Sequence, residues 1–191
     1  MRFLRLTWAK IMRLVGRVPH PKPLSNPEMR TIHPDPYSES VKLSPNRGGD
    51  IIPEYIILHH SSGSYLGGIS WIRNPKSRVS YHYLIDPISG NRTQLVWDSK
   101  RAWHAGKSSW KNVIGLNGHS IGIAFSGDTN KRVPAFQEID SVAHKCVYLM
   151  DKFGIPKENI LTHAMISPGR KSDCSGTAYW LVVNRINELK K

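Results

Sequence analysis

Hydrophobic positions along the chain fall into short continuous runs and one long helical stripe. A continuous apolar run at 55–58 predicts a buried strand, because a strand covered on both faces does not alternate. Another strand is expected over 120–125. A strand is also expected over 79–85. Turn residues at 86–91, followed by 93–97, predict that this strand returns as a hairpin. Residues 63–71 are expected to be a loop that enters a short helix.

The C-terminal third has the spacing of α-helices. Apolar residues from Ile139 to Phe153 recur with a 3.6-residue period after Pro134, and Gly154 is expected to end this helix. A last helix is predicted over about 177–189. Strands that alternate with helices indicate an α/β fold, a single domain with a central mixed β-sheet flanked by helices.

The first 50 residues differ from the rest of the chain. In a helical projection of residues 1–18 the apolar side chains share one side and the arginines the other, which predicts a basic amphipathic N-terminal helix. Such a helix either packs on the domain or binds an anionic membrane or envelope surface. Prolines recur through 19–50 and predict an extended Pro-rich linker or a strap along the domain. The domain itself is then expected over 51–191.

Composition narrows the class of protein. A chain of 191 residues with 39% apolar residues is typical of one globular domain, expected to act as a monomer. A formal net charge of +13 favours polyanionic partners, which are nucleic acid, anionic lipid or phosphate-bearing envelope polymers. Two cysteines, Cys146 and Cys174, exclude a disulfide framework.

Targeting signals are not evident in the sequence. No apolar stretch is long enough for a transmembrane helix. Arg5, Lys10 and Arg13 interrupt the only stretch that could serve as the apolar part of a cleavable signal peptide. We therefore expect synthesis in the cytoplasm, and any action on an envelope would follow release or export.

Residues 163–174 gather an imidazole, a carboxylate, a thiol and two cations, and Pro168-Gly169 predicts a turn that brings both ends together. Zinc binds such groups, and a catalytic zinc takes three protein ligands. His163 and Asp173 could supply two, and His59 or His60, at the end of a predicted strand, could supply the third. Taken singly, each histidine is more simply a hydrogen-bonded surface residue.

Five motifs that occur in order along the chain strengthen the hypothesis that these residues form one zinc site. They are Ile-Ile-Leu-His-His-Ser-Ser-Gly (56–63), Val-Ser-Tyr-His-Tyr-Leu-Ile (79–85), Arg-Ala-Trp-His-Ala-Gly (101–106), Ser-Ile-Gly-Ile (120–123) and Thr-His followed by Ser-Pro-Gly-Arg-Lys-Ser-Asp (162–173). Together, over about residues 51–190, they resemble the zinc-dependent N-acetylmuramoyl-L-alanine amidases of type 2. That superfamily includes phage amidase-lysozymes, bacterial recycling amidases and peptidoglycan recognition proteins.

The resemblance implies a zinc (Zn²⁺) site made by His59, His163 and Asp173, with His60 in a structural role. It places Lys171 beside the bound carbonyl group and Tyr81 near the metal, where both could stabilise an oxyanion. His104 is a candidate proton donor to the leaving amine, or alternatively a structural or substrate-contacting residue.

The implied substrate is the amide bond between muramic acid and L-alanine, in peptidoglycan of the cell wall or in muropeptides in the cytoplasm. Recycling-type members carry a glutamate after Ser-Ile-Gly-Ile, whereas this chain has Ala124. No general base is therefore assigned, and the expected mechanism relies on Tyr81. Trp71, Trp103 and Trp110 could stack on substrate or could pack in the core.

Three alternatives remain at this point. Cys174 competes with Asp173 as third ligand, but the family keeps its ligand two residues after the lysine, which favours Asp173. A metal-free peptidoglycan-binding module usually lacks the third ligand, so Asp173 argues against it. A nucleic-acid binder would fit the charge, but no recognised binding motif accompanies the scattered basic residues.

Overall fold

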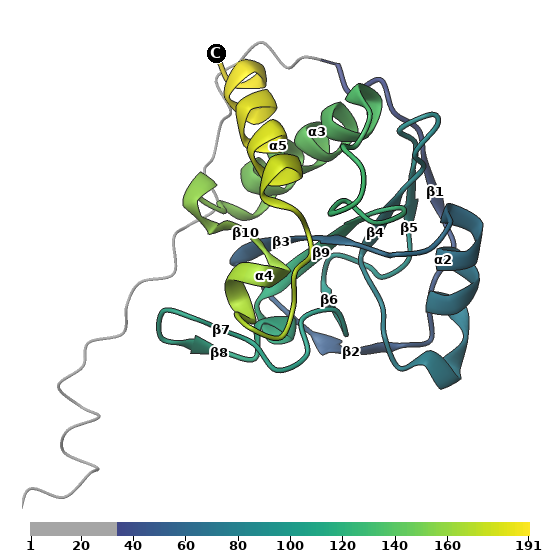
Figure 1. Cartoon of the computed structure of the whole chain (residues 1–191). Helices are drawn as coiled ribbons and strands as arrows, with labels where there is room; N and C mark the ends of the chain where they lie inside the picture. Colours follow the sequence, from purple (N-terminus) through teal and green to yellow (C-terminus); the bar gives the residue numbers. More distant parts are fainter. Residues whose placement is uncertain (1–33) are drawn as a thin grey trace, which may run out of the picture. The chain divides into compact units, whose positions relative to one another are not determined.

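A computed structural model describes residues 34–191 and has a mixed six-stranded sheet at its centre (Figure 1). The strand order is β1 (Glu39–Val41), β5 (Arg92–Gln94), β4 (Tyr83–Ile85), β9 (Ser120–Phe125), β3 (Tyr55–His60) and β10 (Ile160–Thr162). Within this six-stranded sheet only β4 and β5 are antiparallel neighbours; they form the predicted hairpin. The expected mixed α/β sheet is confirmed.

The two central strands, β3 and β9, are buried along their whole length, which explains the continuous apolar run at 55–58 in β3. Successive β3 residues point to opposite faces, so Ile56 and Leu58 contact one core cluster while Tyr55 and Ile57 contact another. The strand continues two residues beyond the predicted run. His59 and His60 therefore lie in the strand itself.

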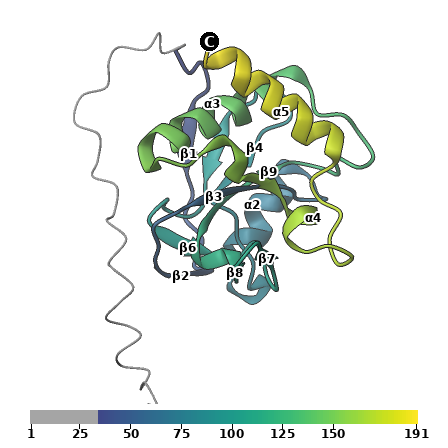
Figure 2. The same cartoon turned by 90° about the vertical axis from the view of Figure 1, so that its left-hand side faces the viewer.

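Two long helices cover one face of the sheet, α3 (Phe136–Phe153) and α5 (Gly176–Leu189), as Figures 1 and 2 both show. Their apolar stripes form the main core cluster with alternate residues of β3, β4 and β9. Gly154 ends α3 in the left-handed conformation, at a φ of 68°, as its sequence predicted. Ser175 caps α5 by accepting a hydrogen bond from the Ala178 amide.

The other face carries shorter elements and two smaller clusters. Helix α2 (Tyr65–Arg73) packs on Leu84 and Ala124, while α4 (His163–Ile166) and the 3-10 turn η2 (Leu116–Gly118) pack near Ile57. The remaining elements are the 3-10 turns η1 (Pro75–Ser77) and η3 (Lys157–Asn159) and the antiparallel pairs β2 (Arg47–Asp50) with β6 (Lys100–Ala102) and β7 (Ser109–Trp110) with β8 (Val113–Ile114).

The strand predicted over 79–85 is shorter in the structure and begins only at Tyr83. His82 still bonds to Gly122 and Leu95, but the Ser80 amide donates to the Trp103 carbonyl group, so the backbone leaves the sheet before His82. Tyr81, in this segment, packs against the cluster formed by α2, Leu84 and Ala124.

Residues 34–50 belong to the stretch expected to be a linker or strap, and they contribute β1 and β2 to the folded unit, which begins at Pro34. Buried Arg92 holds this segment through ion pairs with Asp35 (2.5 Å) and Glu39 (3.3 Å). The prolines flank these strands and do not interrupt them, as expected for an edge strand. The helix expected over 1–18 and linker residues 19–33 lie outside the described residues.

Within residues 34–191, no helix is both long enough and apolar enough to cross a membrane.

Candidate active site

The predicted metal ligands come from neighbouring strand ends on the face that carries α2 and α4. Strands β3 and β10 are parallel neighbours, so their carboxyl ends lie side by side. His59 is the penultimate residue of β3, and His163 follows β10 as the first residue of α4, which Thr162 caps. The loop after α4 returns Asp173 to the same place, and such strand ends are where α/β folds position chemistry.

His59, His163 and Asp173 have ligand atoms that all lie within 4.8 Å of one another. Asp173 Oδ2 is 3.0 Å from His59 Nδ1 and 3.2 Å from His163 Nδ1. All three side chains are buried. Two imidazole nitrogens and a carboxylate oxygen are a donor set that zinc accepts, and no other group of this kind occurs within residues 34–191.

The electrostatics of the cluster favour the protonation states that a metal requires. Burial lowers the pKa of His59 to about 4, so its imidazole is neutral near pH 7. Burial opposes ionisation of Asp173, but hydrogen bonds from His163 and His59 outweigh it and lower the pKa of the carboxyl group. A neutral His59 and an ionised Asp173 can bind metal without first losing protons.

Each histidine also has a partner on its distal ring nitrogen. His59 Nε2 lies 2.9 Å from His104 Nδ1, and His163 Nε2 lies 3.2 Å from the Ala105 carbonyl oxygen. His104 Nε2 in turn faces the Ser120 carbonyl oxygen at 3.4 Å. Both nitrogens of His104 are thus engaged within the protein, and burial lowers its pKa well below the ordinary value. This arrangement fits the structural alternative for His104.

His60, the last residue of β3, lies outside the ligand group, although it also lines the cleft beside the cluster. Its Nδ1 is 3.0 Å from the Thr129 hydroxyl, which also accepts a hydrogen bond from the Ser175 amide. His60 thereby joins the end of β3 to the loop that carries Asp173. Thr129, which the sequence analysis did not single out, has no sequence signal for this role because it lies in an ordinary polar loop.

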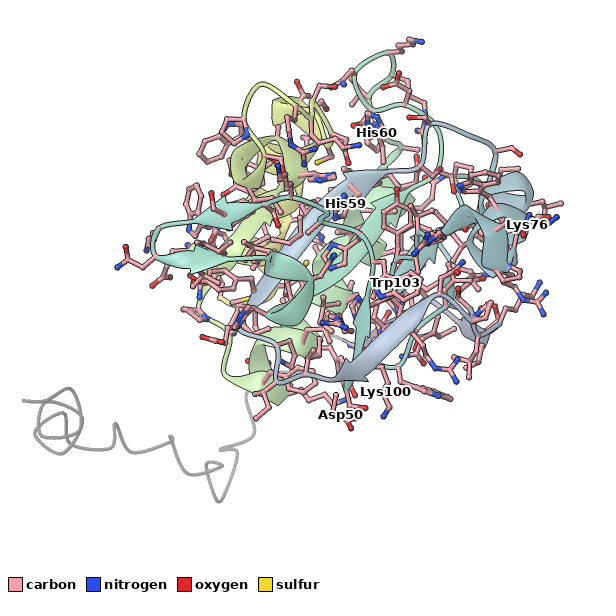
Figure 3. The ribbon with its side chains drawn as sticks, turned by 90° about the horizontal axis from the view of Figure 1, so that it is seen from below. Asp50, His59, His60, Lys76, Lys100 and Trp103 are labelled. Carbon is pink, nitrogen blue, oxygen red and sulfur yellow. The ribbon has the colours of Figure 1, made fainter. Side chains whose placement is uncertain are left out.

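A cleft of about 390 Å³ leads to the cluster. Helix α2 forms one wall with Gly67, Gly68 and Trp71, and Trp103 contributes from the segment after β6. Figure 3 labels Trp103 and His59, and of these two Trp103 lines the cleft. Trp110, in contrast, packs against the Tyr55–Ile57 cluster away from the cleft lining.

Tyr81 and Lys171 both line the cleft beside the cluster. The Tyr81 ring centroid is 5.2 Å from that of His59. Burial, followed by the charge of Asp173, raises the pKa of the Tyr81 hydroxyl, which therefore stays protonated. Lys171 is exposed, and within residues 34–191 it has no ion-pair partner. Its ammonium group is free to meet an anion.

Two residues of interest point away from the cleft. Cys174 is buried in the core cluster under α5, although it follows Asp173 directly. Ala124 pairs with His59 across β9 and β3 and packs on the α2 cluster, so no carboxylate occupies that position.

Comparisons with known proteins agree with this geometry. Residues 48–176 match the family model for N-acetylmuramoyl-L-alanine amidase (Amidase_2), which is more than half of the chain. The chain therefore belongs to the N-acetylmuramoyl-L-alanine amidase family, the type 2 amidases of the zinc-dependent superfamily.

Among relatives, N-acetylmuramoyl-L-alanine amidase A of Achromobacter lyticus is 44% identical over 72 residues, covering 38% of this chain and 36% of that enzyme. The 1,6-anhydro-N-acetylmuramyl-L-alanine amidase AmpD of Citrobacter freundii is 31% identical over 160 residues, covering 81% of this chain and 78% of that enzyme. A crystal structure of a selenomethionine AmpD derivative superimposes with a TM-score of 0.66 at 26% identity, covering 81% of this chain and 95% of that one.

Proposed function

We propose that this protein is a zinc-dependent amidase that hydrolyses the bond between N-acetylmuramic acid and L-alanine in peptidoglycan or muropeptides. The observation that carries the proposal is the His59, His163 and Asp173 cluster, which meets a cleft through His163 and Asp173, in a chain that belongs to this family. Water adds to the lactyl carbonyl carbon, the carbon–nitrogen bond breaks, and the products are a lactyl carboxylate and a peptide with a free N-terminal alanine.

His59, His163 and Asp173 would hold the zinc ion through Nδ1, Nδ1 and a carboxylate oxygen. Zinc, when bound, would supply a Lewis acid that polarises the scissile carbonyl group and makes water more acidic. The buried distal nitrogens of both histidines would keep the rings in place, because each already has a hydrogen-bond partner.

Lys171 and Tyr81 would stabilise the negative charge that develops on the carbonyl oxygen. Both line the cleft, one as a free ammonium group and the other as a protonated hydroxyl. Preorganised donors of this kind lower the barrier because they gain strength as charge develops. His104 would act by orienting His59, since neither of its ring nitrogens is free to donate a proton to the leaving amine.

Trp71 and Trp103 would contact the sugar or peptide of the substrate. Trp71 lines the cleft, and 57% of its surface stays exposed in the folded protein. Stacking on a substrate would bury this apolar surface.

The test is incubation of the purified protein with a soluble muramoyl peptide and with purified sacculi, with mass spectrometry of the released peptides. We expect release of peptides that begin with alanine, loss of this activity after treatment with a chelator, and recovery on addition of Zn²⁺. Full activity in a preparation without measurable metal contradicts the zinc assignment. Release of other fragments contradicts the bond assignment.

We also propose, from the sequence alone, that residues 1–18 bind an anionic membrane or envelope surface. Their apolar side chains and arginines separate on a helical projection as they do in interfacial helices. Deletion of these residues should weaken binding to anionic vesicles and leave hydrolysis of a soluble muropeptide unchanged. Equal vesicle binding by the shortened protein contradicts this role.

A further inference from the structure

One dipeptide, His104-Ala105, contacts both candidate histidine ligands on the side that faces away from Asp173. His59 Nε2 meets the ring of His104 at 2.9 Å, and His163 Nε2 meets the carbonyl oxygen of Ala105 at 3.2 Å. The two histidines come from β3 and α4, which are far apart in the sequence. A single dipeptide therefore contacts both rings, the first through the His104 side chain and the second through the Ala105 carbonyl group.

That segment is itself held by Asn117. The Asn117 side-chain oxygen Oδ1 accepts hydrogen bonds from the His104 amide (2.9 Å) and from the Ala105 amide (2.7 Å). Two donors on consecutive residues that converge on one acceptor restrict both translation and rotation of the dipeptide. Asn117 lies in η2, and the same turn supports the His104 ring, because the Ser120 hydroxyl donates to the Leu116 carbonyl oxygen while the Ser120 carbonyl oxygen faces His104 Nε2.

We propose that Asn117 is a positioning residue of the metal centre, acting through His104-Ala105 on both His59 and His163. Asn117 does not line the cleft and is not one of the candidate ligands. Its effect should therefore be on the affinity for the metal, with no direct contact to substrate. The inference rests on the proposed zinc site. In the sequence, Asn117 between Leu116 and Gly118 predicts only a turn.

The test compares Zn²⁺ affinity, measured by chelator competition, in the unaltered protein and three full-length variants. Asn117→Ala removes the acceptor and should weaken Zn²⁺ binding by about tenfold, the lower end of the effect seen when partners of metal-bound histidines are lost. Asn117→Asp keeps an oxygen in the same place and should retain the affinity. Asn112→Ala is the matched control, since Asn112 is an exposed asparagine between β7 and β8.

A second measurement separates ring positioning from general loosening of the fold. In the zinc-loaded protein, NMR should show slowly exchanging Nε2 protons on His59 and His163, and both should exchange faster in Asn117→Ala than in Asn112→Ala. If Asn117→Ala does not fold, Asn117→Gln, which moves the acceptor by one methylene group, takes its place and should show the same two losses.

The outcomes are distinct. A folded Asn117→Ala or Asn117→Gln protein that binds Zn²⁺ as tightly as the unaltered protein overturns the role of Asn117, and so does an Asn117→Asp protein that loses affinity. An unaltered protein that binds no Zn²⁺ overturns the proposed function itself.

Discussion

At the scale of single residues, the direction in which a side chain points decides which of two adjacent residues belongs to the site. Asp173 faces His59 and His163, whereas Cys174 lies in the core with only 2% of its surface exposed. Thiolate is the softer zinc donor, but burial raises the pKa of the Cys174 thiol to about 12, so it stays protonated. Chemical type alone would have left both residues as candidates.

The first prediction follows from this difference. Asp173→Ala should abolish Zn²⁺ binding and hydrolysis, while Cys174→Ser should keep both. Cys174→Ser should nevertheless cost about 1–3 kcal/mol of stability, because it places a hydroxyl in an apolar core. Metal analysis and urea unfolding measure the two effects. Zinc retained in Asp173→Ala and lost in Cys174→Ser would place the ligand one residue further along.

A second prediction concerns His82, a buried histidine next to the site. Its Nδ1 accepts the Gly122 amide proton and its Nε2 donates to the Lys100 carbonyl oxygen, so only the neutral ring fits. Burial lowers its pKa to about 4, below the ordinary value of 6.5. The unfolded chain then binds a proton first as pH falls, so stability is full above pH 6.5 and declines between pH 6.5 and 4.

For His82 alone the expected loss of unfolding free energy is about 2 kcal/mol between pH 6.5 and 4.5. Urea unfolding with a chelator present should show that His82→Gln, although less stable at neutral pH, loses less stability over this interval. An equal pH dependence in the variant and the unaltered protein would exclude His82 as a source of the acid sensitivity.

At the scale of elements, close packing of β9 against the segment after β6 places His104. The His104 ring lies directly on Gly122, and a Cβ atom at that position would be 2.7 Å from His104 Cγ. This contact gives a physical reason for the glycine within the Ser-Ile-Gly-Ile motif. A larger residue would displace the ring that supports His59.

Gly122→Ala should therefore cost about 1–3 kcal/mol of stability, the usual effect of overpacking, and should also weaken Zn²⁺ binding. Gly176→Ala is the control, because a Cβ atom there meets nothing within 4 Å and the residue opens α5. Thermal unfolding and zinc titration of both variants test the point. Unchanged zinc affinity in a folded Gly122→Ala protein would show that the His104 ring can shift without consequence.

At the scale of the whole molecule, buried charges fasten residues 34–50 to the rest of the domain. Arg92 pairs with Asp35 and Glu39, and Lys145, also buried, pairs with Glu39 at 2.6 Å. Removal of the two carboxylates would leave two cations without their partners. Removal of one partner of a buried ion pair lowers stability strongly, because the other charge is left buried without a partner.

A chain that begins at residue 34 should therefore fold, whereas one that begins at residue 51 should lose about 3 kcal/mol or more of stability. Glu39→Gln in the longer chain is a milder test of the same contacts and should have a smaller effect. Urea unfolding compares the three proteins. Equal stability of the two shortened chains would show that residues 34–50 are only a linker.

The sequence determined the parts of this protein that depend on local periodicity and on a recognisable order of motifs. The buried runs of β3 and β9, the 3.6-residue stripe of α3 and its end at Gly154 all follow from side-chain spacing and backbone preference. The residues at the cleft base were named from the family resemblance, which also favoured Asp173 over Cys174.

Tertiary structure alone decided the relationships between distant segments. No local signal shows that Asp35 and Glu39 meet Arg92, that Asn117 holds the His104-Ala105 backbone, or that both nitrogens of His104 are engaged. Each of these depends on which strands become neighbours, and strand order is set by global packing. The same packing turns a stretch of prolines and polar residues into two strands, because β5 pairs with β1 and β6 pairs with β2.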